Sequence, residues 1–197
     1  MTPRFAAYTC ALLMTLAAAN AAPDSGTSVG AGAQFSSDGR LMPPAGYREW
    51  MFLSSGLDMN YGLTSAMDHS MFDNVFADPQ AYRAFLRTGK WPEGTLLVRE
   101  DRQASEKGSI NRSGKFQTDN IMGVEVHMKD SKRFPGGWGF FFFESLRSEP
   151  AQPIPTSADC YSCHQQHGAV DTTFVQFYPT LMRVATQKHT LSQGYHP

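Results

Sequence analysis

The chain has 197 residues, which is enough for one domain with a hydrophobic core. Hydrophobic residues make up 41% of it and charged residues 18%, an ordinary globular composition. The formal net charge of −1 gives no indication of a nucleic-acid partner or an anionic membrane surface. No stretch reaches the ~20 apolar residues that a membrane-spanning helix needs, so we expect no membrane span.

The first residues are typical of a secretory signal peptide. Arg4 gives a positive start, residues 6–19 form a small apolar region, and Ala19-Asn20-Ala21 fits the small-x-small rule for cleavage. We therefore expect residues 1–21 to be removed and the mature protein to be periplasmic or secreted. An uncleaved anchor is the alternative, but the apolar run is short for that role.

The mature chain opens with a flexible leader over residues 22–43, because this stretch is rich in Gly, Ser and Ala and has little periodicity. We expect one folded domain over residues 44–186 and a frayed tail over residues 187–197. Residues 47–53 are apolar enough to form either a buried strand or a short helix, and periodicity alone does not decide between the two.

The next signals predict a strand followed by a helix. Residues 72–76 form a short apolar run that favours a strand. Asp78 is suited to cap a helix and Pro79 to occupy its first position, while Gly89 is suited to end it. One apolar stripe is expected along this helix, made of Tyr82, Phe85 and Leu86.

The middle of the chain has the pattern of a sheet. Residues 95–99 are strand-like and residues 108–114 are rich in turn formers. Residues 124–129 alternate between apolar and polar, which predicts a half-buried strand with His127 on its polar face. The charges at residues 129–133 are most simply a solvated loop. Residues 138–143 contain four consecutive Phe residues, which predicts a central strand with both faces covered.

A proline-rich connection leads into Cys160-Tyr161-Ser162-Cys163-His164, which reads Cys-x-x-Cys-His, the attachment signature of a c-type haem. Two thiols at this spacing can add to the two vinyl groups of one porphyrin, and the following His can donate a nitrogen to the iron. We therefore expect one covalently attached haem c, with Cys160 and Cys163 as its thioethers and His164 as the proximal axial ligand. Cys10 would leave with the signal peptide, so these are the two cysteines of the mature chain.

Three other interpretations of the motif are open. A dithiol redox centre would need a thioredoxin-like βαβ setting, which is lacking around the motif. A zinc site could use Cys160, Cys163, His164 and His167, but adjacent residues rarely point at one metal ion. A structural disulfide is conceivable in a secreted protein. The His that directly follows Cys163 favours haem c, because the other interpretations do not need it.

After the motif, Asp171 is suited to cap a helix, and Pro179 implies a kink or a restart within a helical apolar pattern that ends near Ala185. His167 is expected on the surface near the haem edge. Met182 is the one methionine downstream of the motif, and no methionine stands in a recognisable ligand context.

These features together resemble the cytochrome P-460 and cytochrome c′-β family over about residues 47–185. The resemblance implies an α+β fold, predominantly an antiparallel β-sheet with a few helices. It also implies a homodimer and a five-coordinate haem c with an aromatic distal side. It rests on Tyr47-Arg48-Glu49-Trp50, Tyr82, Thr88-Gly89, Gly94-Thr95, Lys129-Asp130-Ser131-Lys132-Arg133-Phe134, the Trp138 strand, the haem motif, Asp171 and Phe177-Tyr178-Pro179.

Two functions exist within this family. Cytochromes P-460 oxidise hydroxylamine and carry a Lys cross-linked to the porphyrin, whereas cytochromes c′-β lack the cross-link and bind gases such as nitric oxide. The cross-linking Lys lies just before the Thr-Gly pair, where this chain has Leu86 and Arg87, with Lys90 just beyond. This departure favours a cytochrome that binds small ligands such as nitric oxide or passes electrons to a redox partner protein. Hydroxylamine oxidation is the alternative, so whether the chain is an enzyme stays open.

The aromatic strand supplies candidates for the distal side of the haem. Phe141 and Phe143 share one face of the predicted strand and Phe140 and Phe142 share the other, and either pair could cover the iron. Glu144 continues the face of Phe140 and Phe142 near a position where a carboxylate assists hydroxylamine oxidation in the family, which makes it the candidate catalytic residue. A strand-end glutamate in water is the alternative interpretation.

Overall fold

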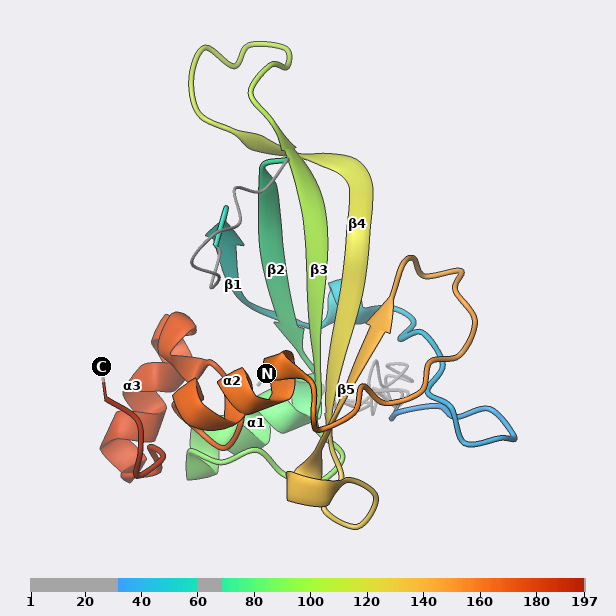
Figure 1. Ribbon diagram of the computed structural model, residues 1–197. Coiled ribbons are helices and arrows are strands. Elements are labelled where there is room, and N and C mark those ends of the chain that lie inside the picture. Colours follow the sequence, from blue (N-terminus) through green and yellow to red (C-terminus); the bar gives the residue numbers. More distant parts are fainter. Residues whose placement is uncertain (1–31, 60–68, 197) are drawn as a thin grey trace, which may run out of the picture.

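The computed structural model describes residues 32–59 and 69–196 (Figure 1). The expected signal peptide, residues 1–21, lies outside the described residues, as do residues 22–31 of the expected leader. In the part of the chain that the structure describes, no helix is long and apolar enough to cross a membrane.

The fold is built on one antiparallel sheet of five strands, ordered β1-β2-β3-β4-β5. Every strand pairs with the next one along the chain, so the sheet is a meander. This confirms the predicted α+β class with a mainly antiparallel sheet. The strands are β1 (Met51–Leu57), β2 (Met71–Ala77), β3 (Leu96–Ser105), β4 (Phe116–Lys129) and β5 (Trp138–Phe143).

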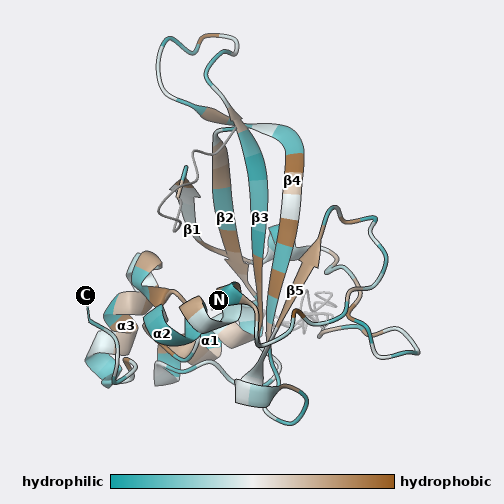
Figure 2. Ribbon diagram, in the orientation of Figure 1, coloured by the Kyte–Doolittle hydropathy of each residue, from teal (hydrophilic) through white to brown (hydrophobic). Residues whose placement is uncertain are grey.

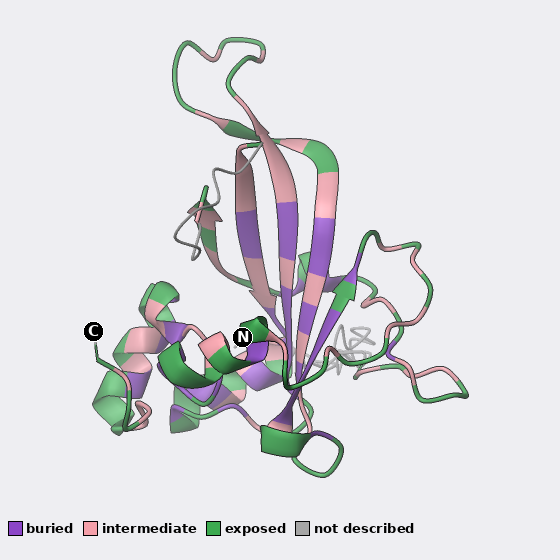
Figure 3. Cartoon of the chain, viewed as in Figure 1, coloured by how far each residue is buried: buried purple, intermediate pink, exposed green. Residues whose placement is uncertain are grey.

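Three α-helices gather beside one end of the sheet (Figure 1). They are α1 (Pro79–Thr88), α2 (Asp159–His167) and α3 (Pro179–Lys188), with short 3-10 turns η1 (Tyr47–Glu49), η2 (Pro135–Gly137) and η3 (Val175–Phe177). The stretch at residues 47–53 thus forms a 3-10 turn followed by the start of β1. At the other end, the loop between β3 and β4 extends away from the helices and is mostly exposed (Figure 3).

Helix α1 forms as its local signals predict. The Asp78 side chain accepts hydrogen bonds from the backbone N–H groups of Gln80 and Ala81, at 2.8 and 2.9 Å. Gly89 ends the helix in the left-handed region, with a φ of 72°. The predicted apolar stripe is wrong in part, because Leu86 is 37% exposed. The fully buried positions are instead Ala81 and Phe85, which lie one turn apart on one face.

Strand β5 lies at the edge of the sheet, so the prediction of a central strand is wrong. Its outer edge is covered by the segment that leads to the haem motif, where the N–H of Ile154 donates to the carbonyl of Phe140 at 2.7 Å. Side chains on both faces of β5 are nevertheless buried, because separate hydrophobic clusters cover the two faces. Phe142 departs from this pattern and is 46% exposed.

The two hydrophobic clusters lie on opposite faces of the sheet. One joins the sheet to the helices and includes Phe85, Phe140 and Leu181. The other is closed by the N-terminal segment and includes Tyr47 and Phe141. Apolar and polar residues alternate along β4, as Figure 2 shows. This alternation follows from the arrangement of the clusters, because each face of a strand meets a different neighbour. Burial of each large apolar side chain stabilises the fold by roughly 1.5–3 kcal/mol.

Candidate functional site

A cavity of about 360 Å³ lies between the sheet and the helical layer. This volume falls in the range of cofactor pockets, about 300–1,000 Å³. The sheet provides one wall and the motif helix with the segment that follows it provides the other. The lining residues are Ser54, Gly56, Met59, Asp73, Val75, Leu97, Arg99, Glu125, His127, Asp159, Cys160, Cys163, His164, Phe174, Phe177 and Tyr178.

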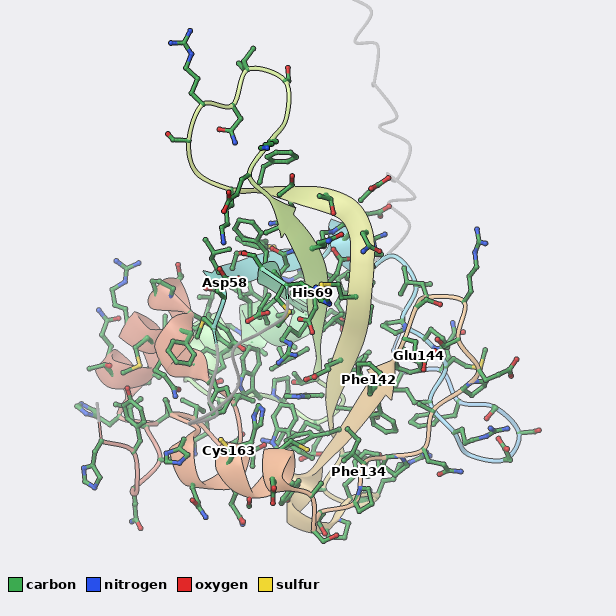
Figure 4. All side chains as sticks on the ribbon, turned by 45° about the horizontal axis from the view of Figure 1, so that its top comes forward. Asp58, His69, Phe134, Phe142, Glu144 and Cys163 are labelled. Carbon is green, nitrogen blue, oxygen red and sulfur yellow. The ribbon has the colours of Figure 1, made fainter. Side chains whose placement is uncertain are left out.

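Helix α2 presents the motif to the cavity. Cys160, Cys163 and His164 are spaced three and four residues apart, so they lie on one face of the helix, and all three line the cavity. Both cysteines are free thiols (Cys163 is labelled in Figure 4). The one buried residue of α2, Tyr161, packs on Phe140 with ring centroids 5.3 Å apart and anchors the helix to β5.

The His164 imidazole is held in one tautomer. Its Nδ1 lies 2.9 Å from the carbonyl oxygen of Thr172. A carbonyl can only accept, so Nδ1 carries the proton and Nε2 keeps its lone pair for a metal. The ring also stacks on Phe174, with centroids 4.0 Å apart. Burial lowers the pKa of His164 to about 4, so the ring is neutral at pH 7.

His127 lies on the polar face of β4, as predicted, but there it lines the cavity and packs against other rings. Its ring stacks on Phe140 with centroids 4.1 Å apart and lies edge-on to His164 at 4.7 Å. Burial, reinforced by the neighbouring His164, lowers the pKa of His127 far below its ordinary value. The polar face of β4 points at the cavity rather than at bulk water, which the alternation alone cannot reveal.

Charged side chains form part of the sheet wall. Arg99 donates to both carboxylate oxygens of Asp101 at 2.9 Å and to Glu125 at 2.9 Å. Burial opposes the positive charge, but Glu125 and Asp101 outweigh this effect and keep the pKa of Arg99 above its ordinary value. Burial also raises the pKa of Glu125. Asp73 also acts electrostatically on Arg99, so three carboxylates favour the charged form of this one guanidinium.

Asp73 is the least satisfied member of this group. It is 7% exposed, and its Oδ1 has no hydrogen-bond partner among the described residues. Burial raises the pKa of Asp73 to about 6. Sequence reasoning missed Asp73, Arg99 and Glu125. The sequence did show a charged residue within each of these predicted strands, but charged residues in strands more often face water.

The predicted distal residues lie elsewhere. Phe140 packs against the His164 ring with centroids 4.9 Å apart, and neither Phe140 nor Phe142 lines the cavity. Glu144 is exposed just beyond the end of β5 and does not line the cavity either (Figure 4). This placement fits the alternative interpretation of Glu144 as a strand-end residue in water, because β5 ends one residue before it.

The positions considered for a lysine cross-link lie outside the cavity. Leu86, Arg87 and Lys90 are exposed at the end of α1 and beyond it. In residues 32–59 and 69–196, no lysine lines the cavity.

The zinc interpretation finds no support in the described part of the chain, where no group of three or more His, Cys, Asp and Glu residues is arranged to hold a metal ion. His167 is exposed at the end of α2, as expected, and does not line the cavity.

Comparison with known proteins identifies one family. The family model described as cytochrome P460 matches residues 44–175, about two thirds of the chain. In a comparison with curated proteins, none matches the chain. The match covers the whole sheet, α1 and the motif helix, and it ends before α3.

Proposed function

Since the chain belongs to the cytochrome P460 family and is therefore a haem-binding cytochrome, we propose that it holds one haem c through thioethers at Cys160 and Cys163. His164 would be the axial iron ligand. The observation that carries this proposal is the shared face of α2, where both thiols and a neutral imidazole line one cavity. The hydrogen bond to Thr172 supports it further, because it leaves Nε2 of His164 ready to bind iron.

The cavity residues fit a haem. Its walls combine apolar and aromatic side chains with two free thiols and one oriented imidazole. When bound, the haem would supply a redox-active iron able to bind a small ligand. Cys160 and Cys163 would hold the macrocycle, the Thr172 carbonyl would orient His164, and the apolar and aromatic lining would shield the haem from water.

We propose a five-coordinate resting state that binds small ligands such as nitric oxide or passes electrons to a redox partner protein. Met59 is the one methionine among the described lining residues, so it is the side chain to test as a competing sixth ligand. We further propose that the mature protein is periplasmic or secreted and forms a homodimer, as the family resemblance implies.

The test is an optical spectrum of the purified, dithionite-reduced protein before and after addition of nitric oxide. A high-spin haem c spectrum that changes with nitric oxide is expected. A low-spin spectrum in the resting protein that becomes high-spin in Met59→Leu would contradict the open site. A denaturing gel stained for haem tests attachment, and the double variant Cys160→Ala/Cys163→Ala should lose the stained band.

Hydroxylamine oxidation is a second candidate, favoured by the carboxylates in the cavity wall. Asp73 and Glu125 both have raised pKa values, which suits a group that accepts protons from a bound substrate. The absence of lysine from the described cavity lining argues against a cross-linked porphyrin. Turnover of hydroxylamine with an electron acceptor, reduced strongly in Asp73→Asn, would support this candidate. No turnover in the haem-loaded protein would exclude it.

A further inference from the structure

Lys129, at the end of β4, belongs to a network of contacts with other segments rather than to the solvated loop that the charge pattern predicts. Its side chain is 16% exposed. The ammonium donates to Asp171 at 2.8 Å and to the carbonyl of Trp91 at 2.9 Å. It also lies 5.8 Å from the ring centroid of Trp138. Lys129 is therefore held by contacts to three other segments, two of which are distant in the sequence.

Asp171 lies in the turn between α2 and η3, and the prediction that it caps a helix is wrong. Its backbone is left-handed, with a φ of 54°, a conformation that is uncommon for non-glycine residues but that Asp adopts more readily than most. The turn closes where the N–H of Thr173 donates to the carbonyl of Val170 at 3.0 Å. Trp91 secures the same turn, because its indole N–H donates to the Thr173 hydroxyl at 2.9 Å.

This turn supplies the hydrogen bond that orients the proposed iron ligand. Thr172, which follows Asp171 directly, accepts the His164 Nδ1 proton through its backbone carbonyl at 2.9 Å. One continuous series of contacts thus runs from Lys129 through Asp171 and the Thr172 carbonyl to His164. Neither Lys129 nor Asp171 lines the cavity, so neither would touch a haem bound there, and the contacts described lead to it through His164.

We propose that Lys129 and Asp171 are positioning residues for His164, which hold the Thr172 carbonyl where it accepts the Nδ1 proton. This inference rests on the proposed function of His164 as the haem iron ligand. A hydrogen bond to Nδ1 makes the imidazole a more basic ligand, which favours the ferric over the ferrous iron. The ion pair therefore keeps the reduction potential lower than it would be with a freely rotating imidazole.

The experiment compares the haem-loaded wild type with Lys129→Met, Asp171→Asn and the double variant. Lys129→Met keeps an unbranched side chain over Trp138 and removes the charge. We expect each single variant to raise the midpoint potential by roughly the equivalent of a tenfold change in the ferric-to-ferrous ratio, about 59 mV. The double variant should shift no further than the larger single shift, because both residues act through one ion pair.

A second readout reports the ligand bond itself. In the ferrous protein, the iron–histidine stretching frequency in resonance Raman spectra should fall in both single variants. Lys129→Arg retains the charge and should stay near wild type. Arg40→Met is the matched control, since it breaks an exposed pair of similar length, Arg40 to Asp38 at 2.7 Å, outside the cavity lining. Its potential and Raman frequency should be unchanged.

Unchanged potential and frequency in folded, haem-loaded Lys129→Met would overturn the inference. If that variant does not fold, Asp171→Asn decides, because the Asp171 side chain is 39% exposed and its replacement leaves no buried charge at that position. Failure of the proposed function is a separate result, recognised by a wild-type protein without covalently bound haem.

Discussion

Two buried carboxylates lie on opposite faces of the sheet, and their surroundings shift their pKa values in opposite directions. Asp73 faces the cavity, where burial raises its pKa to about 6. Glu100 faces the other cluster and accepts hydrogen bonds from the Tyr47 hydroxyl and from the guanidinium groups of Arg48 and Arg102. Burial raises the pKa of Glu100, but these donors outweigh it and leave the pKa below its ordinary value.

Asp73→Asn should stabilise the haem-loaded protein at neutral pH. The native carboxyl keeps its proton up to about pH 6, whereas the unfolded one loses it near 3.8. Ionised Asp73 therefore destabilises the native state increasingly as the pH rises through this window. We expect a gain of roughly 1–2 kcal/mol at pH 7 after allowance for solvent screening. Chemical denaturation from pH 3.5 to 7.5 measures it, and a constant difference across this range would contradict the assignment.

Glu100→Gln should lower the stability at neutral pH, the opposite of the effect expected for Asp73→Asn. Because the folded pKa is depressed, ionised Glu100 stabilises the native state above its unfolded pKa of 4.5, and this contribution disappears as the pH falls through the folded pKa. Loss of the charge among two guanidinium groups should cost about 3 kcal/mol at pH 7. The same denaturation series checks it. A destabilisation that persists undiminished in acid would indicate a packing effect instead.

At the level of single elements, α1 shows what local sequence can and cannot predict. Its start and end are set by Asp78 and Gly89, whose effects depend only on neighbouring backbone. Which residues it buries depends on where α3 and the sheet approach it, so Leu86 was expected inside and lies outside. The edge position of β5 and the cavity-facing side of β4 escaped prediction for the same reason, because both are set by distant segments.

The corrected face of α1 has a measurable consequence. Phe85 is fully buried and stacks near Trp91 with ring centroids 4.4 Å apart. Phe85→Ala should lower the free energy of unfolding by about 3–5 kcal/mol, since it removes a large side chain and leaves a void. Leu86→Ala is the control on the same helix and should change it by less than about 1 kcal/mol. Equal losses of unfolding free energy for the two variants in urea titrations would contradict this and support the predicted stripe, in which Leu86 is buried.

The Cys-x-x-Cys-His motif can be predicted to attach a haem from five consecutive residues alone, because thioether chemistry requires this spacing within one segment. The rest of the cavity was not identified. Arg99 and Asp73 come from different strands, and their proximity follows from strand register rather than from any local pattern. The aromatic strand suggested Phe142 and Glu144, but the twist and edge of a sheet decide which positions reach a site.

At the scale of the whole molecule, the cavity lies between the sheet and the C-terminal segments. A haem bound there would therefore act as part of the core. The variant without the motif thiols, Cys160→Ala/Cys163→Ala, should bind no covalent haem and should unfold at a lower temperature, because a group that binds only the native state stabilises it. Limited proteolysis should then cut first between residues 150 and 178, while circular dichroism retains the sheet signal. Equal melting temperatures would contradict this role.

Helix α2 contributes a single buried side chain, Tyr161, whose hydroxyl donates to the carbonyl of Pro135 at 3.1 Å. This small number of buried contacts has a consequence for the order in which the protein would fold and acquire its haem. Tyr161 is the one buried residue that α2 adds to the core shared by the strands and α1, so we expect most of that core to be able to form before α2 docks, while both thiols are still accessible. Docking of Tyr161 against β5 would then follow, and covalent attachment of a haem would be separate in time from the folding of the sheet.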